Sequence, residues 1–137
     1  MIKTIFKLTS SLFFLSNFSY AKDDFTFTDY IKVTATAYTS STKECDASPF
    51  LAAWRNKLSP KVPSIAVSRD LLEIGLTNGM KVHVEGLEGE FIVLDKMNKR
   101  WTNRIDIYMN NNRQKALKFG KRKLKVYWID PLFAKAK

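Results

Sequence analysis

Six short runs of strand-like sequence follow one another along the chain from residue 30 onward. Three of them alternate between apolar and polar side chains, which is typical of strands with one face on a core. Strands that outnumber helices, with turn residues between them, predict a mainly β domain built as a small barrel or a sandwich. In chain order the predicted strands are 30–38, 64–67, 81–85, 90–94, 104–109 and 122–129.

Two or three short helices are predicted to connect these strands, over residues 49–54, 69–74 and 113–119. The first begins with a proline, which suits the first turn of a helix. Ser68 and Asn112 precede the other two and can cap their N-termini. Both of these helices are followed by glycine, a common C-terminal stop.

Residues 1–21 have the build of a cleaved secretory signal. Two lysines precede an apolar stretch, and small residues at the −3 and −1 positions precede the charged residues from Lys22 onward. The apolar stretch is too short for a membrane span of about 20 residues. We therefore expect a periplasmic, soluble protein exported across the inner membrane. Residues 22–137 are expected to form one domain, with the tail from Asp130 outside regular structure.

The composition restricts the chemistry. The 137 residues include one Cys and one His, so a Cys/His zinc cluster, a CxxC redox pair and an intramolecular disulfide are excluded. We expect no metal and no cofactor, and carboxylates are the remaining candidates for catalysis. The role of Cys45, as a buried thiol or an interchain partner, is left open, as is the oligomeric state.

Two carboxylates stand where the apolar pattern predicts something else. Asp95 directly follows the apolar run 91–94, and Asp106 lies between two isoleucines on an alternating strand. A strand end, a loop and a returning strand separate them, so they can lie in the same neighbourhood and act together as catalytic groups. Equally, Asp95 can cap the following loop and Asp106 can face solvent.

The chain carries, in this order, the motifs Val33–Tyr38, Ile65–Val67, Gly79–Val84, Phe91–Asp95, Arg104–Tyr108 and Ala116–Gly120. The order and spacing of these motifs resemble the three-aspartate domain. That domain is shared by secreted wall-active proteins and forms part of the A-type membrane-bound lytic murein transglycosylases. The resemblance covers about residues 31–129 and implies a six-stranded double-psi β-barrel.

The resemblance also implies roles for single residues. Asp95 matches the catalytic acid of the family, and Asp106 matches the aspartate that supports it. The family's first aspartate position holds Ser68 here, and Asp70 is the candidate replacement. The loop 96–103 is bulky and cationic where the commoner family pattern has a glycine pair.

The activity so implied is that of a lytic transglycosylase, which cleaves the MurNAc–GlcNAc bond of peptidoglycan and forms a 1,6-anhydro ring. Asp95 would first protonate the glycosidic oxygen and then accept the proton of the C6 hydroxyl, while Asp106 would stabilise the cationic centre. A binding or wall-loosening module that does not cut glycan is the alternative, and a secreted interaction protein on the same scaffold is a third reading. The expected substrate-binding residues are Thr36, Tyr38, Asp70, Trp101 and Asn103.

The net charge of +10 indicates an anionic partner. Two of these charges belong to the predicted signal, which leaves +8 on residues 22–137. Export argues against nucleic acid as the physiological partner. The expected partners are therefore peptidoglycan glycan strands with their peptide carboxylates, or an anionic membrane surface.

Overall fold

The computed structural model describes residues 27–40 and 52–134, which include six strands and four short helices. The predicted signal 1–21 and Cys45 lie outside the described residues. In chain order the elements are β1 (Asp29–Tyr38), η1 (Ala53–Arg55), β2 (Ser64–Val67), α1 (Arg69–Glu73), β3 (Lys81–Val84), β4 (Phe91–Lys96), β5 (Arg104–Tyr108), α2 (Arg113–Phe119), β6 (Arg122–Trp128) and α3 (Pro131–Ala134).

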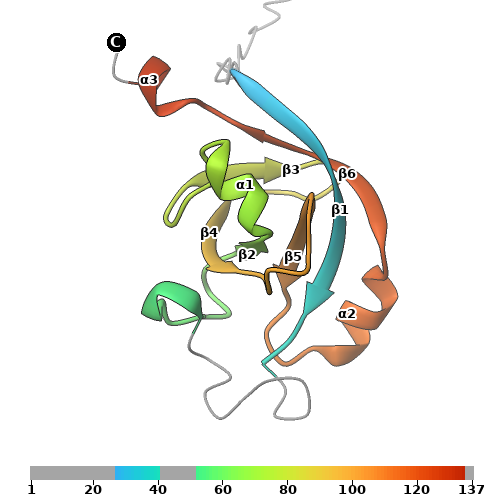
Figure 1. The fold of residues 1–137 in the computed structure, drawn as a ribbon. Coiled ribbons are helices and arrows are strands. Elements are labelled where there is room, and N and C mark those ends of the chain that lie inside the picture. The colour runs from blue at the N-terminus through green and yellow to red at the C-terminus, as the bar shows by residue number, and fades with distance from the viewer. Residues whose placement is uncertain (1–26, 41–51, 135–137) are drawn as a thin grey trace, which may run out of the picture.

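The six strands close into a barrel in the order β1-β5-β2-β4-β3-β6 (Figure 1). β1 runs parallel to β5, and β2 runs parallel to β4. The other four neighbouring pairs are antiparallel. The prediction of a mainly β chain with six strands and few helices is confirmed, and of the two architectures considered the closed barrel is the one that forms.

The interior of the barrel is filled by two apolar side chains from each strand. Alternation along each strand sends these side chains inward and their neighbours outward. Removing a valine, isoleucine or phenylalanine side chain from water stabilises the fold by roughly 1.5–3 kcal/mol. The twelve are Val33, Ala35, Ile65, Val67, Val82, Val84, Phe91, Val93, Ile105, Ile107, Val126 and Trp128.

Of the two predicted N-cap residues, Asn112 caps its helix through its side chain, whereas Ser68 takes the N-cap position without a side-chain cap. Asn112 caps α2 as expected, because its side chain accepts a hydrogen bond from the backbone N–H of Lys115 at 2.9 Å. Ser68 occupies the N-cap position of α1, but its side chain makes no capping bond. It accepts instead from the backbone N–H of Arg104 at 2.9 Å.

Two other expectations about helices were wrong. The described part of the predicted helix 49–54 contributes only to the 3₁₀ turn η1, because Trp54 and Arg55 have left-handed φ values of 58° and 61°. The tail, expected to be irregular, forms the short helix α3. Within residues 27–40 and 52–134, no helix is both long enough and apolar enough to cross a membrane.

Candidate functional site

A β-bulge decides where Asp95 points. Val93 pairs with Ile65 of β2, but the next pair is Asp95 with Ala66, so Leu94 is an extra residue in β4. Val93 points into the barrel, and in a regular strand Asp95 would point inward as well. The bulge turns the carboxylate of Asp95 to the outside of the barrel, opposite Ala66.

The register then places the second carboxylate on the same outer surface. Ala66 of β2 pairs with Asp95 on one side and with Asp106 of β5 on the other. The two aspartates are therefore separated by two strand spacings, about 10 Å between their backbones. Asp106 in turn pairs with Thr36 of β1, whose hydroxyl donates to its carboxylate at 2.9 Å. Asp95 and Asp106, predicted from sequence to be neighbours, lie on either side of one small side chain.

Tyr38 lies within reach of both carboxylates. Its hydroxyl donates to Oδ2 of Asp95 at 3.3 Å. Burial, and after it the negative charges of Asp95 and Asp106, raise the pKa of Tyr38 far above its usual range. The phenol therefore stays protonated and acts as a hydrogen-bond donor to Asp95.

The carboxylate of Asp95 is held by backbone donors as well. Its Oδ1 accepts from the N–H of Ala53 at 2.7 Å and from the N–H of Lys96 at 2.9 Å. Together with the Tyr38 hydroxyl, these donors engage both oxygens, which is the pattern of a hydrogen-bond acceptor. The turn that supplies Ala53 contains the two left-handed residues of η1, so the chain adopts an unfavourable backbone there while it wraps the carboxylate.

The loop after β4 forms a wall beside this pair of aspartates. It is anchored at its start, where the N–H of Met97 donates to the carbonyl of Val67 at 2.9 Å. Within it, Trp101 is half-buried, and the guanidinium carbons of Arg100 and Arg104 lie 4.9 and 4.0 Å from its ring centre. Such cation–π contacts hold an aromatic ring in a fixed orientation.

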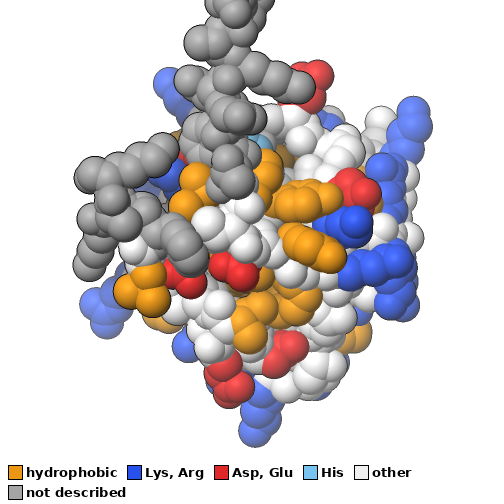
Figure 2. Space-filling model, turned by 90° about the horizontal axis from the view of Figure 1, so that it is seen from above, with side chains coloured by type: hydrophobic (Ala, Val, Ile, Leu, Met, Phe, Trp, Pro, Cys, Tyr) orange, Lys and Arg blue, Asp and Glu red, His pale blue; other side chains and the backbone are white. Residues whose placement is uncertain are grey.

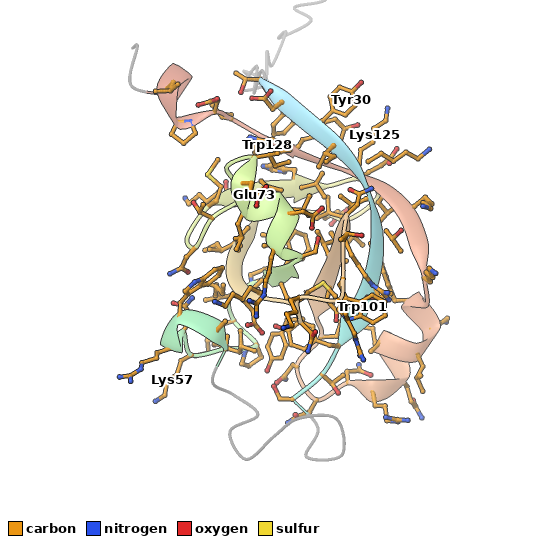
Figure 3. All side chains as sticks on the ribbon, in the orientation of Figure 1. Tyr30, Lys57, Glu73, Trp101, Lys125 and Trp128 are labelled. Atoms are coloured by element: carbon orange, nitrogen blue, oxygen red, sulfur yellow. The ribbon has the colours of Figure 1, made fainter. Side chains whose placement is uncertain are left out.

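An open groove of about 240 Å³ lies between these elements. Its lining is Tyr38, Ala66, Asp95, Lys96, Met97, Asn98, Trp101 and Asp106. Hydrogen-bonding carboxylates and an amide beside an aromatic ring are the groups that bind a polyhydroxylated chain. Figure 3 shows Trp101 at the lower end of the barrel, near β1 and β5.

Two larger hollows lie elsewhere in the described residues. One, of about 490 Å³, is lined by residues such as Pro60, Leu87 and Met109, and the other, of about 370 Å³, by residues such as Phe27 and Met80. Neither brings two aspartates together. The smaller groove is therefore the candidate site on chemical grounds, although it is not the largest hollow.

Asp70 and Asn103, which were expected to bind substrate, contact each other outside the groove lining. The N–H of Asn103 donates to Asp70 at 2.8 Å, and Asn103 has a left-handed φ of 47°. Burial raises the pKa of Asp70, but the Ser68 hydroxyl and the Asn103 N–H outweigh this and lower it below its usual value. This pair fixes the end of the 96–103 loop just before β5 begins. Thr36 contacts Asp106 and is likewise absent from the lining.

Several groove residues were missed by sequence reasoning. Ala66 is an ordinary small residue in a buried strand, and the backbone N–H of Ala53 carries no sequence signal. Met97 and Asn98 belong to a loop whose sequence indicated only bulk and positive charge.

The described residues contain no group of three or more His, Cys, Asp or Glu side chains able to hold a metal ion.

No family model matches the chain, and no curated protein matches it either. Among solved structures, it is similar to the Streptomyces papain inhibitor, with 16% sequence identity and a TM-score of 0.50. This match covers 76% of the present chain and 97% of the inhibitor. The likeness concerns the fold alone.

A second similar structure is the expansin of Clavibacter michiganensis in its apo form. The identity is again 16%, the TM-score is 0.48, and the match covers 75% of this chain and 52% of the expansin. The chain spans about half of the expansin's length.

Proposed function

We propose that the protein is a peptidoglycan-binding, wall-loosening module whose groove holds a glycan strand. The observation that carries the proposal is the state of Asp95. Both of its oxygens accept hydrogen bonds from the protein's own N–H and O–H groups, which suits an acceptor that orients ligand hydroxyls. Trp101, which lines the same groove, would contact the apolar face of a sugar ring with the part of its ring that Arg100 and Arg104 leave uncovered.

The proposal includes the fold family and the compartment. The two parallel strand pairs in an otherwise antiparallel six-stranded barrel, and the likeness to the inhibitor structure, support a double-psi β-barrel. The motif order supports a relation to the three-aspartate domain. The signal-like residues 1–21 support export to the periplasm, where peptidoglycan lies. The similar structure is named as an inhibitor of papain and not as an enzyme, and one fold can serve unrelated functions.

A lytic transglycosylase is the second candidate function. It is favoured by one observation, the meeting of Asp95, Asp106 and Tyr38 on the wall of one groove. In that role Asp95 would protonate the glycosidic oxygen and later take the proton of the C6 hydroxyl, so that proton count and charge balance over the two steps. Before the first step, Asp95 would have to be protonated and one of its oxygens released from its present donor.

Sedimentation with purified sacculi, followed by mass spectrometry of the soluble products, separates the two functions. We expect the protein, expressed from its full sequence, to pellet with sacculi and to release no anhydro-muropeptides. Trp101→Ala should weaken binding by about 0.5–1.5 kcal/mol, or roughly 2- to 12-fold. Glu73→Gln, which removes an exposed carboxylate on α1, is the matched control and should bind as the wild type.

Three other outcomes are informative. Release of anhydro-muropeptides that Asp95→Asn abolishes would replace the binding module with the enzyme. If Trp101→Ala binds sacculi as tightly as the wild type, the groove is not the glycan-binding site and the proposal is wrong on that point. A protein that stays in the supernatant would refute both functions and favour an interaction protein with another partner.

A further inference from the structure

The outer face of β1 carries a continuous row of side chains that begins at the groove. Alternation places Tyr38, Thr36, Thr34, Lys32 and Tyr30 on this face, because Val33 and Ala35 point into the barrel. Eight residue steps separate the two tyrosines, a span of roughly 26 Å. Tyr30 is 63% exposed, so the row leads from the half-buried groove wall to the open surface.

The neighbouring strand β6 adds positive charge along this row. Lys123 pairs with Thr34, and Lys125 pairs directly with Lys32. Like charges opposite each other destabilise an antiparallel pair, so nothing in the folding of the barrel favours this arrangement. Lys125 forms a cation–π contact with Tyr30, whose ring centre lies 5.3 Å from the ammonium nitrogen of Lys125.

Arg104 of β5 joins the groove to this positive charge. It pairs with Thr34 of β1, and its guanidinium carbon lies 4.0 Å from the ring centre of Trp101. Arg104, Lys123, Lys32 and Lys125 thus form a cationic row that starts beside the groove's tryptophan. Figure 3 shows Tyr30 and Lys125 together at the upper right, on the side of β1 and β6, and Figure 2 shows Lys and Arg gathered on the same side.

Two exposed lysines of this row, Lys32 and Lys123, are not paired with carboxylates in the described residues. Within residues 27–40 and 52–134, neither Lys32 nor Lys123 forms an ion pair, and the ion pair that is present joins Lys81 at the start of β3 to Glu90 just before β4. The carboxylate of Glu85 contacts the backbone N–H of Lys125 at 2.8 Å. Exposed lysines without partners can engage a ligand's charges without breaking bonds within the protein.

We propose that the cationic row is a second binding region, which takes the carboxylates of peptides attached to the glycan strand held in the groove. The inference rests on the proposed function and names the form of peptidoglycan that the site prefers. The inference is based on the position of the cationic row, which starts at the groove and follows the axis of a strand. A linear polymer that carries charges at intervals needs such an arrangement. The two hydroxyl-bearing threonines between the groove and the lysines make this a polar track instead of an apolar membrane-contacting face.

The test compares two charge-matched double variants. Lys32→Gln/Lys123→Gln removes two charges from the cationic row, and Lys57→Gln/Lys61→Gln removes two exposed charges from the segment between η1 and β2. Figure 3 shows Lys57 at the lower left, away from Lys125 of β6. Binding to intact sacculi and to sacculi freed of peptides by an amidase is measured by sedimentation over a range of protein and salt concentrations.

We expect the wild type to bind peptide-bearing sacculi more tightly than peptide-free glycan. The row variant should lose roughly 2- to 10-fold in affinity for intact sacculi at low salt and keep its affinity for peptide-free glycan. The control variant should keep the wild-type preference. The difference between the variants should shrink as salt rises, because exposed charges are screened.

Each contrary result has its own meaning. Equal binding by the two double variants, or an equal loss on both forms of glycan, would overturn the proposal while leaving the groove intact. Failure of the wild type to bind either form would refute the proposed function itself. Vesicles of phosphatidylglycerol and phosphatidylcholine provide the remaining comparison: if the row variant loses vesicle binding but keeps its preference among sacculi, the row is a membrane-docking surface and the proposal is wrong.

Discussion

Tyr38 couples the stability of the barrel to the geometry of the groove. Its hydroxyl is buried and bonded to Asp95, while its ring packs against Tyr108 with 5.4 Å between ring centres. A single side chain therefore closes one wall of the groove and contributes to the small apolar cluster around Ala52, Leu58 and Tyr108. Both the free energy of unfolding and ligand binding should therefore be measured for any substitution of Tyr38.

Tyr38→Phe is expected to lower the free energy of unfolding by about 1–2 kcal/mol at neutral pH, because Asp95 loses a donor. The raised pKa adds a pH dependence. Above about pH 10 the unfolded state ionises this phenol while the folded state does not, so wild-type stability falls as pH rises. The free energy of unfolding of Tyr38→Phe should fall less steeply with pH. The difference between the two slopes should be up to about 1.4 kcal/mol per pH unit.

Urea unfolding between pH 7 and 11 measures both effects. Tyr30→Phe is the control, since its ring is 63% exposed and its substitution should change stability by less than about 0.5 kcal/mol. Identical alkaline slopes for wild type and Tyr38→Phe would contradict the assignment of a buried, un-ionised phenol.

Asp70 provides the complementary dependence at acid pH. Its pKa in the folded state is lowered, so it stabilises the fold above its unfolded value of about 3.9, and this contribution is lost as pH falls through the folded value. Asp70→Asn should therefore be less stable than wild type at pH 6, with the difference closing below pH 4. Unfolding at both pH values checks this, with Glu73→Gln as the control. A constant difference would assign Asp70 a role independent of its charge.

At the scale of elements, two buried serines show how a hydrogen bond ties α1 to β5. The Ser68 hydroxyl accepts from the N–H of Arg104, whereas the Ser64 hydroxyl has no partner among the described residues. Both side chains are fully buried. The pair thus separates the effect of a bond from that of a buried hydroxyl.

Ser68→Ala is expected to destabilise the protein by about 1–3 kcal/mol, because the N–H of Arg104 loses its acceptor and the carboxylate of Asp70 loses the Ser68 hydroxyl as a donor. Ser64→Ala should be neutral or slightly stabilising, because it removes a polar group that gains nothing from burial. Chemical denaturation of the two variants measures the difference. Equal losses would show that the Ser68 bond contributes nothing beyond packing.

The closed barrel joins all of these elements into one folding unit. β6 completes the ring by pairing with both β1 and β3, so a defect on either side disturbs the same interior. Val126 on β6 and Val93 on β4 are both fully buried in that interior. The whole molecule is expected to unfold in one cooperative transition.

Val126→Ala and Val93→Ala should each lower the free energy of unfolding by roughly 2–3 kcal/mol through the cavity they leave. Both should shift a single transition, followed by far-UV and near-UV circular dichroism together. Transitions that separate between the two probes, or a shift confined to one of them, would show that the barrel opens in parts.

Local sequence pattern determined the strands, the cap of α2 and the choice of carboxylates. The six runs predict β1 to β6 to within two residues at each end, because period-two alternation directly reports which face of a strand is buried. Asp95 and Asp106 were found because a charged residue within or directly after an apolar run breaks that pattern. These signals are local, and the chain retains them whatever its tertiary fold.

Tertiary structure decided what those residues face. The bulge at Leu94 turns Asp95 outward, and the pairing of Ala66 with strands on both sides brings Asp106 beside it. The donors from Ala53 and Tyr38 and the separation of Asp70 from the groove lining depend on contacts between residues far apart in the chain. Register and strand order are set by the packing of the whole barrel, so a single strand's sequence cannot encode them.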